Sequence, residues 1–157
     1  MTSGYFVAIS SAFFGALLGA FAKQVIDYFI KRSDRREKVR DARTDLLIST
    51  IFEIRDLACK YWADSDIGVE TIVRESQIVG KLEYVPQLYG DLFTSHINEK
   101  RICDTRFNAF KKSIQGDEFQ VRGRSANPQK TMEIELLSHS LVGFIQVERS
   151  KMKSSLF

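Results

Sequence analysis

A continuous apolar run opens the chain. Residues 5–22 carry no charged side chain, and apolar residues remain frequent up to Ile30. Eighteen helical residues extend about 27 Å, close to the roughly 30 Å thickness of bilayer hydrocarbon. A helix in a soluble core normally keeps one charged face, so the run favours a transmembrane helix over a buried one.

A cleaved signal peptide is the alternative interpretation, because the "AFA" at residues 20–22 fits a cleavage site. The segment before the run, "MTSG", has no Lys or Arg, and the residues after the site are apolar and then strongly basic. We therefore expect a retained single-pass anchor in the cell inner membrane. The positive-inside rule places the N-terminus outside and the C-terminal side in the cytoplasm.

The predicted anchor has a face of small residues. On a helical wheel Ser11, Gly15 and Gly19 form one row, with the bulky residues mostly on the other half. Small residues let membrane helices approach closely, so this row predicts a homo-oligomer. Lys23 and Asp27 extend the row and are predicted to pair between subunits. The alternatives are small residues that only keep the anchor mobile, and a snorkelling lysine beside a solvated aspartate.

After the anchor the pattern changes to helices with one apolar face. Neither Pro nor Gly occurs between residues 27 and 66, which predicts one long helix that ends in "ADSDIG" at 63–68. Further helices are expected at 69–84, 86–97, 98–115 and 129–153, with Pro86 in a helix first turn.

Apolar stripes on these helices predict a shared core. The expected core positions are Leu46, Leu47, Ile51, Phe52, Ile54, Leu57, Ala58, Tyr61 and Trp62, then Cys103, Phe107, Phe110 and Ile114, and finally Met132, Leu136, Leu137, Leu141, Phe144, Ile145 and Val147. The predicted fold is all-α: an N-terminal transmembrane helix continuing into a cytoplasmic antiparallel bundle of about four helices. The expected division is an anchor at 1–30, a charged juxtamembrane helix at 31–66 and a bundle at 67–157.

Charge is concentrated directly after the anchor. The net charge is only +3, but residues 31–45 hold seven Lys or Arg and four acidic residues. A nucleic-acid groove would contain fewer acids, so DNA is not an expected partner. Ion pairs on a solvated helix explain many of these charges. Contact with anionic lipid headgroups is predicted for Lys31, Arg32, Arg35 and Arg36.

Signals of catalysis are sparse, and we expect no enzyme, no cofactor and no metal site. Cys59 and Cys103 lie in no C-x-x-C motif, and His96 and His139 lie in no metal-ligand motif. Neither a phosphate-binding loop nor a dinucleotide-binding pattern occurs. The segment at 116–129 is expected to hold a short strand or to form a mobile loop. In it Arg122 and Arg124 are candidates for contact with a phosphate, the alternative being a solvated turn.

The architecture resembles small bacterial membrane proteins, including the membrane accessory proteins of Cas13 RNA-guided antiviral systems. The resemblance is carried by the anchor at 5–22, the helix at 31–62 and the pattern "RFNAFKKSIQGDEF" at 106–119. It implies a bundle of the HEPN type that assembles into rings. The Arg and His pair of HEPN ribonucleases, four to six residues apart, is absent, which argues against ribonuclease activity.

Two functions are therefore predicted as alternatives. In the first, the protein is a non-enzymatic oligomeric effector or scaffold whose assembly alters the membrane, as a pore-like protein in antiviral defence. A pore through the anchor would be hydrophobic, because no polar stripe crosses it. In the second, the anchor is a tether, and the bundle holds a protein or RNA partner at the membrane.

Overall fold

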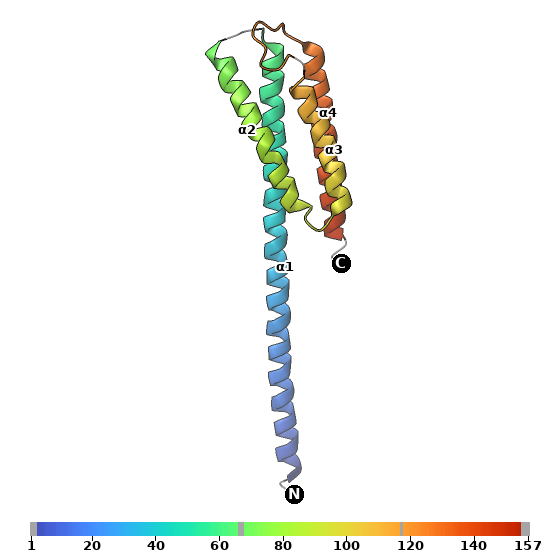
Figure 1. Cartoon of the computed structure of the whole chain (residues 1–157). Coiled ribbons are helices and arrows are strands. Elements are labelled where there is room, and N and C mark those ends of the chain that lie inside the picture. The colour runs from blue at the N-terminus through green and yellow to red at the C-terminus, as the bar shows by residue number, and fades with distance from the viewer. Residues whose placement is uncertain (1–2, 66–67, 117, 155–157) are drawn as a thin grey trace. The chain divides into compact units, whose positions relative to one another are not determined.

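The described part of the chain folds into four helices. The computed structural model describes the backbone of residues 3–65, 68–116 and 118–154, and the side chains within 19–65, 68–116 and 118–153. Its helices are α1 (Ser3–Ala63), α2 (Val69–Leu92), α3 (Ile97–Ile114) and α4 (Pro128–Ser154) (Figure 1). No strand occurs in these ranges. The all-α prediction and the break at 63–68 are confirmed.

Two compact units divide the chain, Met1–Asp41 and Ala42–Phe157. The first unit consists of the N-terminal part of α1. Its described side chains, from Gly19 onwards, are exposed apart from Glu37 and Asp41, which are half-buried. Most side chains of the apolar run at 5–22 lie outside the described residues. Within the part that the structure describes, none of the helices is long and apolar enough to cross a membrane.

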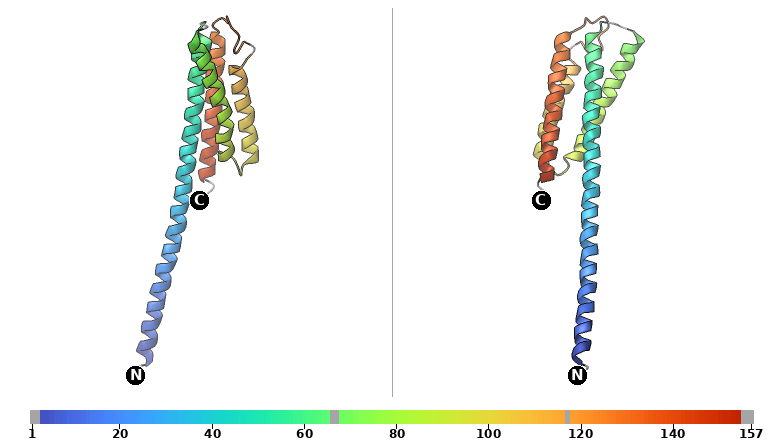
Figure 2. Two further views of the ribbon diagram at one scale, coloured as in Figure 1. Left: turned by 60° about the vertical axis from the view of Figure 1, so that its left-hand side comes forward. Right: turned by 180° about the vertical axis from the view of Figure 1, so that it is seen from behind.

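The second unit is a bundle of residues 42–63 of α1 with α2, α3 and α4. Figures 1 and 2 show α3 running along α4, and in Figure 1 α2 crosses α1 on its way to the base of α3. A single apolar core joins the four helices. Its largest fully buried side chains are Trp62, Tyr61, Phe93, Phe110, Leu47, Ile51, Ile54, Ile78, Leu82, Ile114, Ile134 and Leu141.

Helix α2 corrects one predicted boundary. The sequence predicted a break before Pro86, with a new helix at 86–97, but α2 continues through Pro86 to Leu92. Proline removes one backbone hydrogen bond inside a helix. The buried face of α2 runs through this point, with Leu82 and Val85 before the proline and Leu88 after it. Burial of this face therefore holds the helix together across the proline.

The core stripe predicted on α3 is confirmed, because Cys103, Phe107, Phe110 and Ile114 are all buried. The stripe predicted on α4 is only partly right. Leu141 and Ile145 are buried and Leu137 and Phe144 pack against the core, whereas Met132, Leu136 and Val147 are exposed. The wrong positions lie on the opposite side of the helix, where a second apolar row follows the same spacing. On α1, Leu46 is also exposed.

The connection between α3 and α4 is built from turns in its described residues, 115–116 and 118–127. Gly123 has a φ of 78°, a backbone conformation that glycine adopts without steric cost. The backbone N–H of Asn127 donates to the carbonyl of Trp62 at 2.8 Å, and its side-chain oxygen accepts from the N–H of Lys130 at 3.1 Å. Asn127 therefore caps α4 and fixes its start beside the end of α1.

Candidate functional site

An exposed apolar band covers one side of α1 just before its charged stretch. Phe21 is 67% exposed, and the other large apolar residues of the band are also exposed: Val25, Ile26, Tyr28, Phe29 and Ile30. At 100° per residue these positions cover about 200° of the helix circumference, and the exposed Lys23 and Asp27 lie in the remaining sector. Scattered apolar side chains are normal on a protein surface, but a continuous band of them marks a site of interaction.

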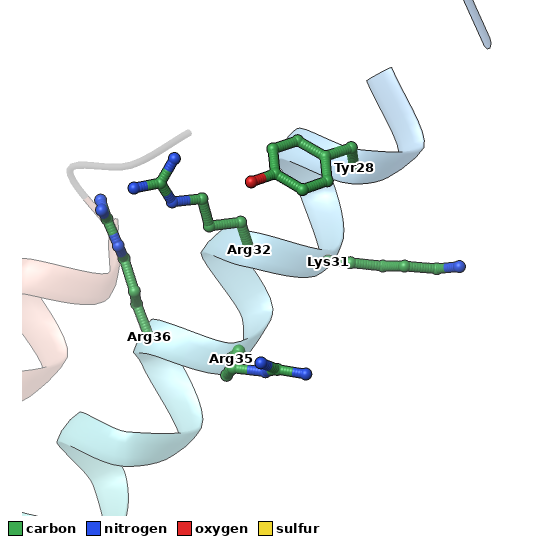
Figure 3. A pocket seen from close by; sticks show the side chains of 5 residues that line it. All are labelled: Tyr28, Lys31, Arg32, Arg35 and Arg36. Carbon is green, nitrogen blue, oxygen red and sulfur yellow. The ribbon is translucent and has the colours of Figure 1, made fainter. Parts of the chain in front are cut away.

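Four cationic side chains follow the band directly. Lys31, Arg32, Arg35 and Arg36 are exposed, and with Tyr28 they line one hollow that is open to solvent. Figure 3 shows Lys31 and Arg35 pointing to one side of the helix, while Arg32 and Arg36 point to the other. An arginine can donate two parallel hydrogen bonds to a phosphate, and a lysine offers a compact charge. The four cations therefore cover about 140° of the helix circumference over about one and a half turns.

The predicted oligomerisation residues are only partly visible. The side chains of Ser11 and Gly15 lie outside the described residues. At Gly19 an added Cβ would meet no other atom within 4 Å. Lys23 and Asp27 are both exposed, and they form no ion pair with each other in the described part of this single chain. The predicted contact between Lys23 and Asp27 of different subunits therefore stays a prediction.

The two arginines of the predicted ligand loop have different environments. Arg122 is exposed, whereas Arg124 is only 6% exposed. The guanidinium of Arg124 lies 3.7 Å from the centre of the Tyr61 ring and 5.1 Å from that of Trp62. Its Nη2 donates to the carbonyl of Tyr61. Arg124 thus fastens the loop to the end of α1, while Arg122 remains accessible to a ligand.

A buried polar network surrounds this attachment, and sequence reasoning missed it. The hydroxyl of Tyr61 donates to Glu75 at 3.1 Å and accepts from the N–H of Gln120 at 2.9 Å. The indole N–H of Trp62 donates to the carbonyl of Ile114 at 3.1 Å. These bonds satisfy polar groups inside the bundle. In the sequence the only signal was that Arg124 follows a glycine in a loop. This pattern does not specify that Arg124 contacts Tyr61 and Trp62, which lie far from it along the chain.

The cysteines and histidines do not gather into a reactive centre. Burial raises the pKa of the Cys59 thiol to about 11 and that of the Cys103 thiol to about 12, so both are protonated at neutral pH. His96 precedes α3, and the exposed His139 lies 3.5 Å from Glu135 on α4. Among the described residues no three His, Cys, Asp or Glu side chains lie close enough to hold a metal ion.

Comparisons with protein-family models, curated proteins and solved structures find no match to this chain. The resemblance to membrane accessory proteins of antiviral systems therefore stays a prediction.

Proposed function

We propose that this protein is a membrane-anchored, self-associating helical scaffold that acts by assembly rather than by catalysis. In this proposal the N-terminal part of α1 inserts into a bilayer, and the bundle at 42–157 stays in water. One observation carries the proposal: an exposed apolar band on α1 is followed immediately by four exposed cations.

Approximate energies support insertion of the band. Burying a large apolar side chain gains about 1.5–3 kcal/mol, and the band has six such residues from Phe21 to Ile30. Each Lys or Arg close to an anionic lipid surface adds about 1 kcal/mol. Lys31, Arg32, Arg35 and Arg36 would then contact lipid phosphates while the apolar band lies in the acyl region. A water-exposed band would forgo both contributions.

Self-association through Ser11, Gly15 and Gly19 belongs to the same proposal, as does the ring of Lys23 and Asp27 contacts. Lipid offers helices no hydrophobic reason to associate, so close packing of small residues has to supply the attraction. A pore and a role in antiviral defence are the uses that the sequence resemblance implies for such an assembly. A tether that holds a protein or RNA partner remains the alternative.

Vesicle flotation tests the anchoring. The full chain is reconstituted with vesicles of phosphatidylcholine, alone or mixed with phosphatidylglycerol, and then centrifuged through a density gradient. We expect the protein to float with both vesicles. We expect Leu17→Asp combined with Phe21→Asp to leave most of the protein at the bottom of the gradient, because both charges would lie inside hydrocarbon, where they are costly.

The matched control is Ile102→Asp combined with Val121→Asp, which changes two exposed apolar residues of the bundle. This control should float like the unchanged chain. Equal flotation of the α1 variant and the control would contradict insertion of the band. Replacement of Lys31, Arg32, Arg35 and Arg36 by Gln should remove any preference for phosphatidylglycerol, and an unchanged preference would contradict the headgroup contact.

A further inference from the structure

Helix α4 carries an apolar row on the side that faces away from the core. Met132 and Leu136 are 63% and 64% exposed, and Val147 is also more than half exposed. With Gly143 these residues fall within about 60° of the helical wheel. The buried residues Ile134, Leu141 and Ile145 occupy the opposite side of the same helix. Surface helices of a bundle normally present polar residues there.

Helix α2 carries a second row with the same spacing. Val69 is 77% exposed, and Val73 and Tyr84 are exposed as well. Gly80 completes the row between Val73 and Tyr84. The two rows have the same spacings of four, seven and four residues: Val69, Val73, Gly80 and Tyr84 on α2, and Met132, Leu136, Gly143 and Val147 on α4. The buried side chains of α2, such as Ile78 and Leu82, lie on the opposite face.

The two rows lie on different sides of the bundle and run in the same direction. α2 begins after the end of α1, and α4 begins directly after Asn127, whose backbone N–H donates to the carbonyl of Trp62 near the same end. In Figure 1 α2 begins on the side of α1 away from α4 and crosses α1 on its way to the base of α3. A neighbouring copy in the same orientation can therefore place its α2 row against the α4 row of the first.

The geometry points to a second copy of this chain as the occupant of the α4 row, bound through its α2 row. In the arrangement that we call level, the two helices are aligned so that Val69 of one copy faces Met132 of the other. Val73 then faces Leu136, and Tyr84 faces Val147. Gly80 then faces Gly143. An added Cβ at either glycine would meet no atom within 4 Å in the single chain, so these positions leave room for close approach.

Charge complementarity supports this choice of partner. In the level arrangement Asp91 of α2 lies within one helical turn of Lys153 on the neighbouring α4. Arg74 lies within one turn of Glu135, and Glu70 lies at the same axial distance on the other side of Glu135. Within one chain Arg74 forms an ion pair with Asp64 at 2.9 Å, and Asp91 forms one with Arg43 at 3.2 Å. A contact with the neighbouring copy would extend each of these ion pairs. A pairing of α4 with a parallel α4 would instead place like charges side by side.

An antiparallel pairing of two α4 helices would also bring opposite charges together, because Glu133 and Glu135 precede the helix centre and Lys151 and Lys153 follow it. Residues 42–63 of α1 run antiparallel to α4 in the bundle (Figure 1). The two copies would then have residue 42, where the chain to the proposed anchor joins the bundle, at opposite ends of the pair, which anchoring in one bilayer does not allow. The exclusion of this arrangement rests on the proposed function, and the experiment below tests it separately.

The contact is heterologous, since two different surfaces of the chain meet. Such contacts leave one free surface at each end, and they build closed rings or open chains rather than stopping at a dimer. The bundle therefore contributes a route of assembly that is independent of the small-residue row on the N-terminal helix.

Cysteine cross-linking of the full chain in detergent tests the proposal. Val73→Cys and Leu136→Cys are introduced together, the protein is mildly oxidised, and a non-reducing gel is run. We expect a ladder of dimers, trimers and larger species that disappears on reduction. The two rows face away from each other within one chain, so the introduced cysteines react only between copies.

Two controls set the background. The unchanged chain, whose Cys59 is half-buried and Cys103 buried, reports any reaction of the native thiols. Gly80→Leu combined with Gly143→Leu, added to the cysteine pair, should abolish the ladder by blocking close approach. Ala109→Leu on the exposed face of α3 should leave it unchanged.

Three results would overturn the proposal. One is a monomer from the cysteine pair in a folded protein, and another is a ladder that survives the glycine substitutions. The third is a dimer of equal yield from Leu136→Cys alone, which would show pairing of α4 with α4. A failure here with normal vesicle flotation would remove the α2 and α4 contact and leave the anchoring intact. Loss of flotation with a normal ladder would do the reverse.

Discussion

Arg124 and Arg122 are two residues apart, but the side chain of Arg124 is buried and that of Arg122 is exposed. Arg124 is buried against Tyr61 and Trp62 and bonds to the backbone of α1. We expect Arg124→Ala to lower the free energy of unfolding by about 2 kcal/mol, because a cation–π contact and a buried hydrogen bond are lost. Urea unfolding followed by the fluorescence of Trp62, the single tryptophan, measures this change.

Arg122→Ala is the matched control. Since Arg122 is exposed, its replacement should change the free energy of unfolding by no more than about 0.5 kcal/mol. Equal effects of the two substitutions would contradict the structural assignment of Arg124. If a phosphate ligand binds this loop, only the Arg122 variant can test it without disturbing the fold.

The two thiols make stability depend on pH in the alkaline range. The ordinary pKa of a cysteine is 9.0 here, and burial raises the pKa of Cys59 to about 11 and that of Cys103 to about 12 in the folded chain. The unfolded chain therefore loses these protons at lower pH than the folded chain. This contribution to stability is complete below pH 9 and is lost as the pH rises toward 12.

We expect the free energy of unfolding to fall between pH 9 and 12, and to fall less steeply in a Cys59→Ala, Cys103→Ala variant. Burial with a hydrogen bond to Asp104 also raises the pKa of Tyr89, so some dependence should remain in the variant. Urea unfolding at several pH values gives both slopes. Identical slopes for the variant and the unchanged chain would show that the thiols do not carry the effect.

Among the elements, α3 was predictable because only one of its faces is apolar. Its four predicted core residues are all buried. Helices α2 and α4 have two apolar rows each, so spacing alone cannot decide which row faces the core. Tertiary packing decides it, and it leaves Met132, Leu136 and Val147 outside. Pro86 was misjudged for a related reason, since burial of α2 outweighs the lost hydrogen bond.

Glycines in the exposed rows of α2 and α4 should lower helix stability in the single chain. Glycine in a helix interior costs about 1 kcal/mol relative to alanine, and an added Cβ at Gly80 or Gly143 meets no atom within 4 Å. We therefore expect Gly80→Ala and Gly143→Ala each to raise the free energy of unfolding by about 1 kcal/mol, as measured by urea unfolding under conditions where the chain is monomeric.

Gly123→Ala should have the opposite sign. Its φ of 78° is a left-handed conformation that costs a residue with a Cβ about 1–2 kcal/mol. A gain in stability from Gly123→Ala, or a loss from both helix substitutions, would contradict this account of the glycines.

At the scale of the whole molecule, the all-α class and the four-helix bundle follow from the sequence because the breaks and amphipathic faces are strong. The proposed anchoring site could be predicted because the apolar stretch up to Ile30 is followed directly by the charged stretch that begins at Lys31. Arg124 and the network around Tyr61 could not be predicted, because they depend on contacts between residues far apart in the chain.

Alkaline carbonate extraction of membranes from cells that express the full chain tests the central claim most directly. Carbonate strips proteins held only by charge and leaves those embedded in hydrocarbon. Anchoring through α1 predicts that the protein stays in the membrane pellet with integral membrane proteins. Release of the protein into the supernatant would contradict the anchor and would leave a bundle that meets membranes through its cations alone.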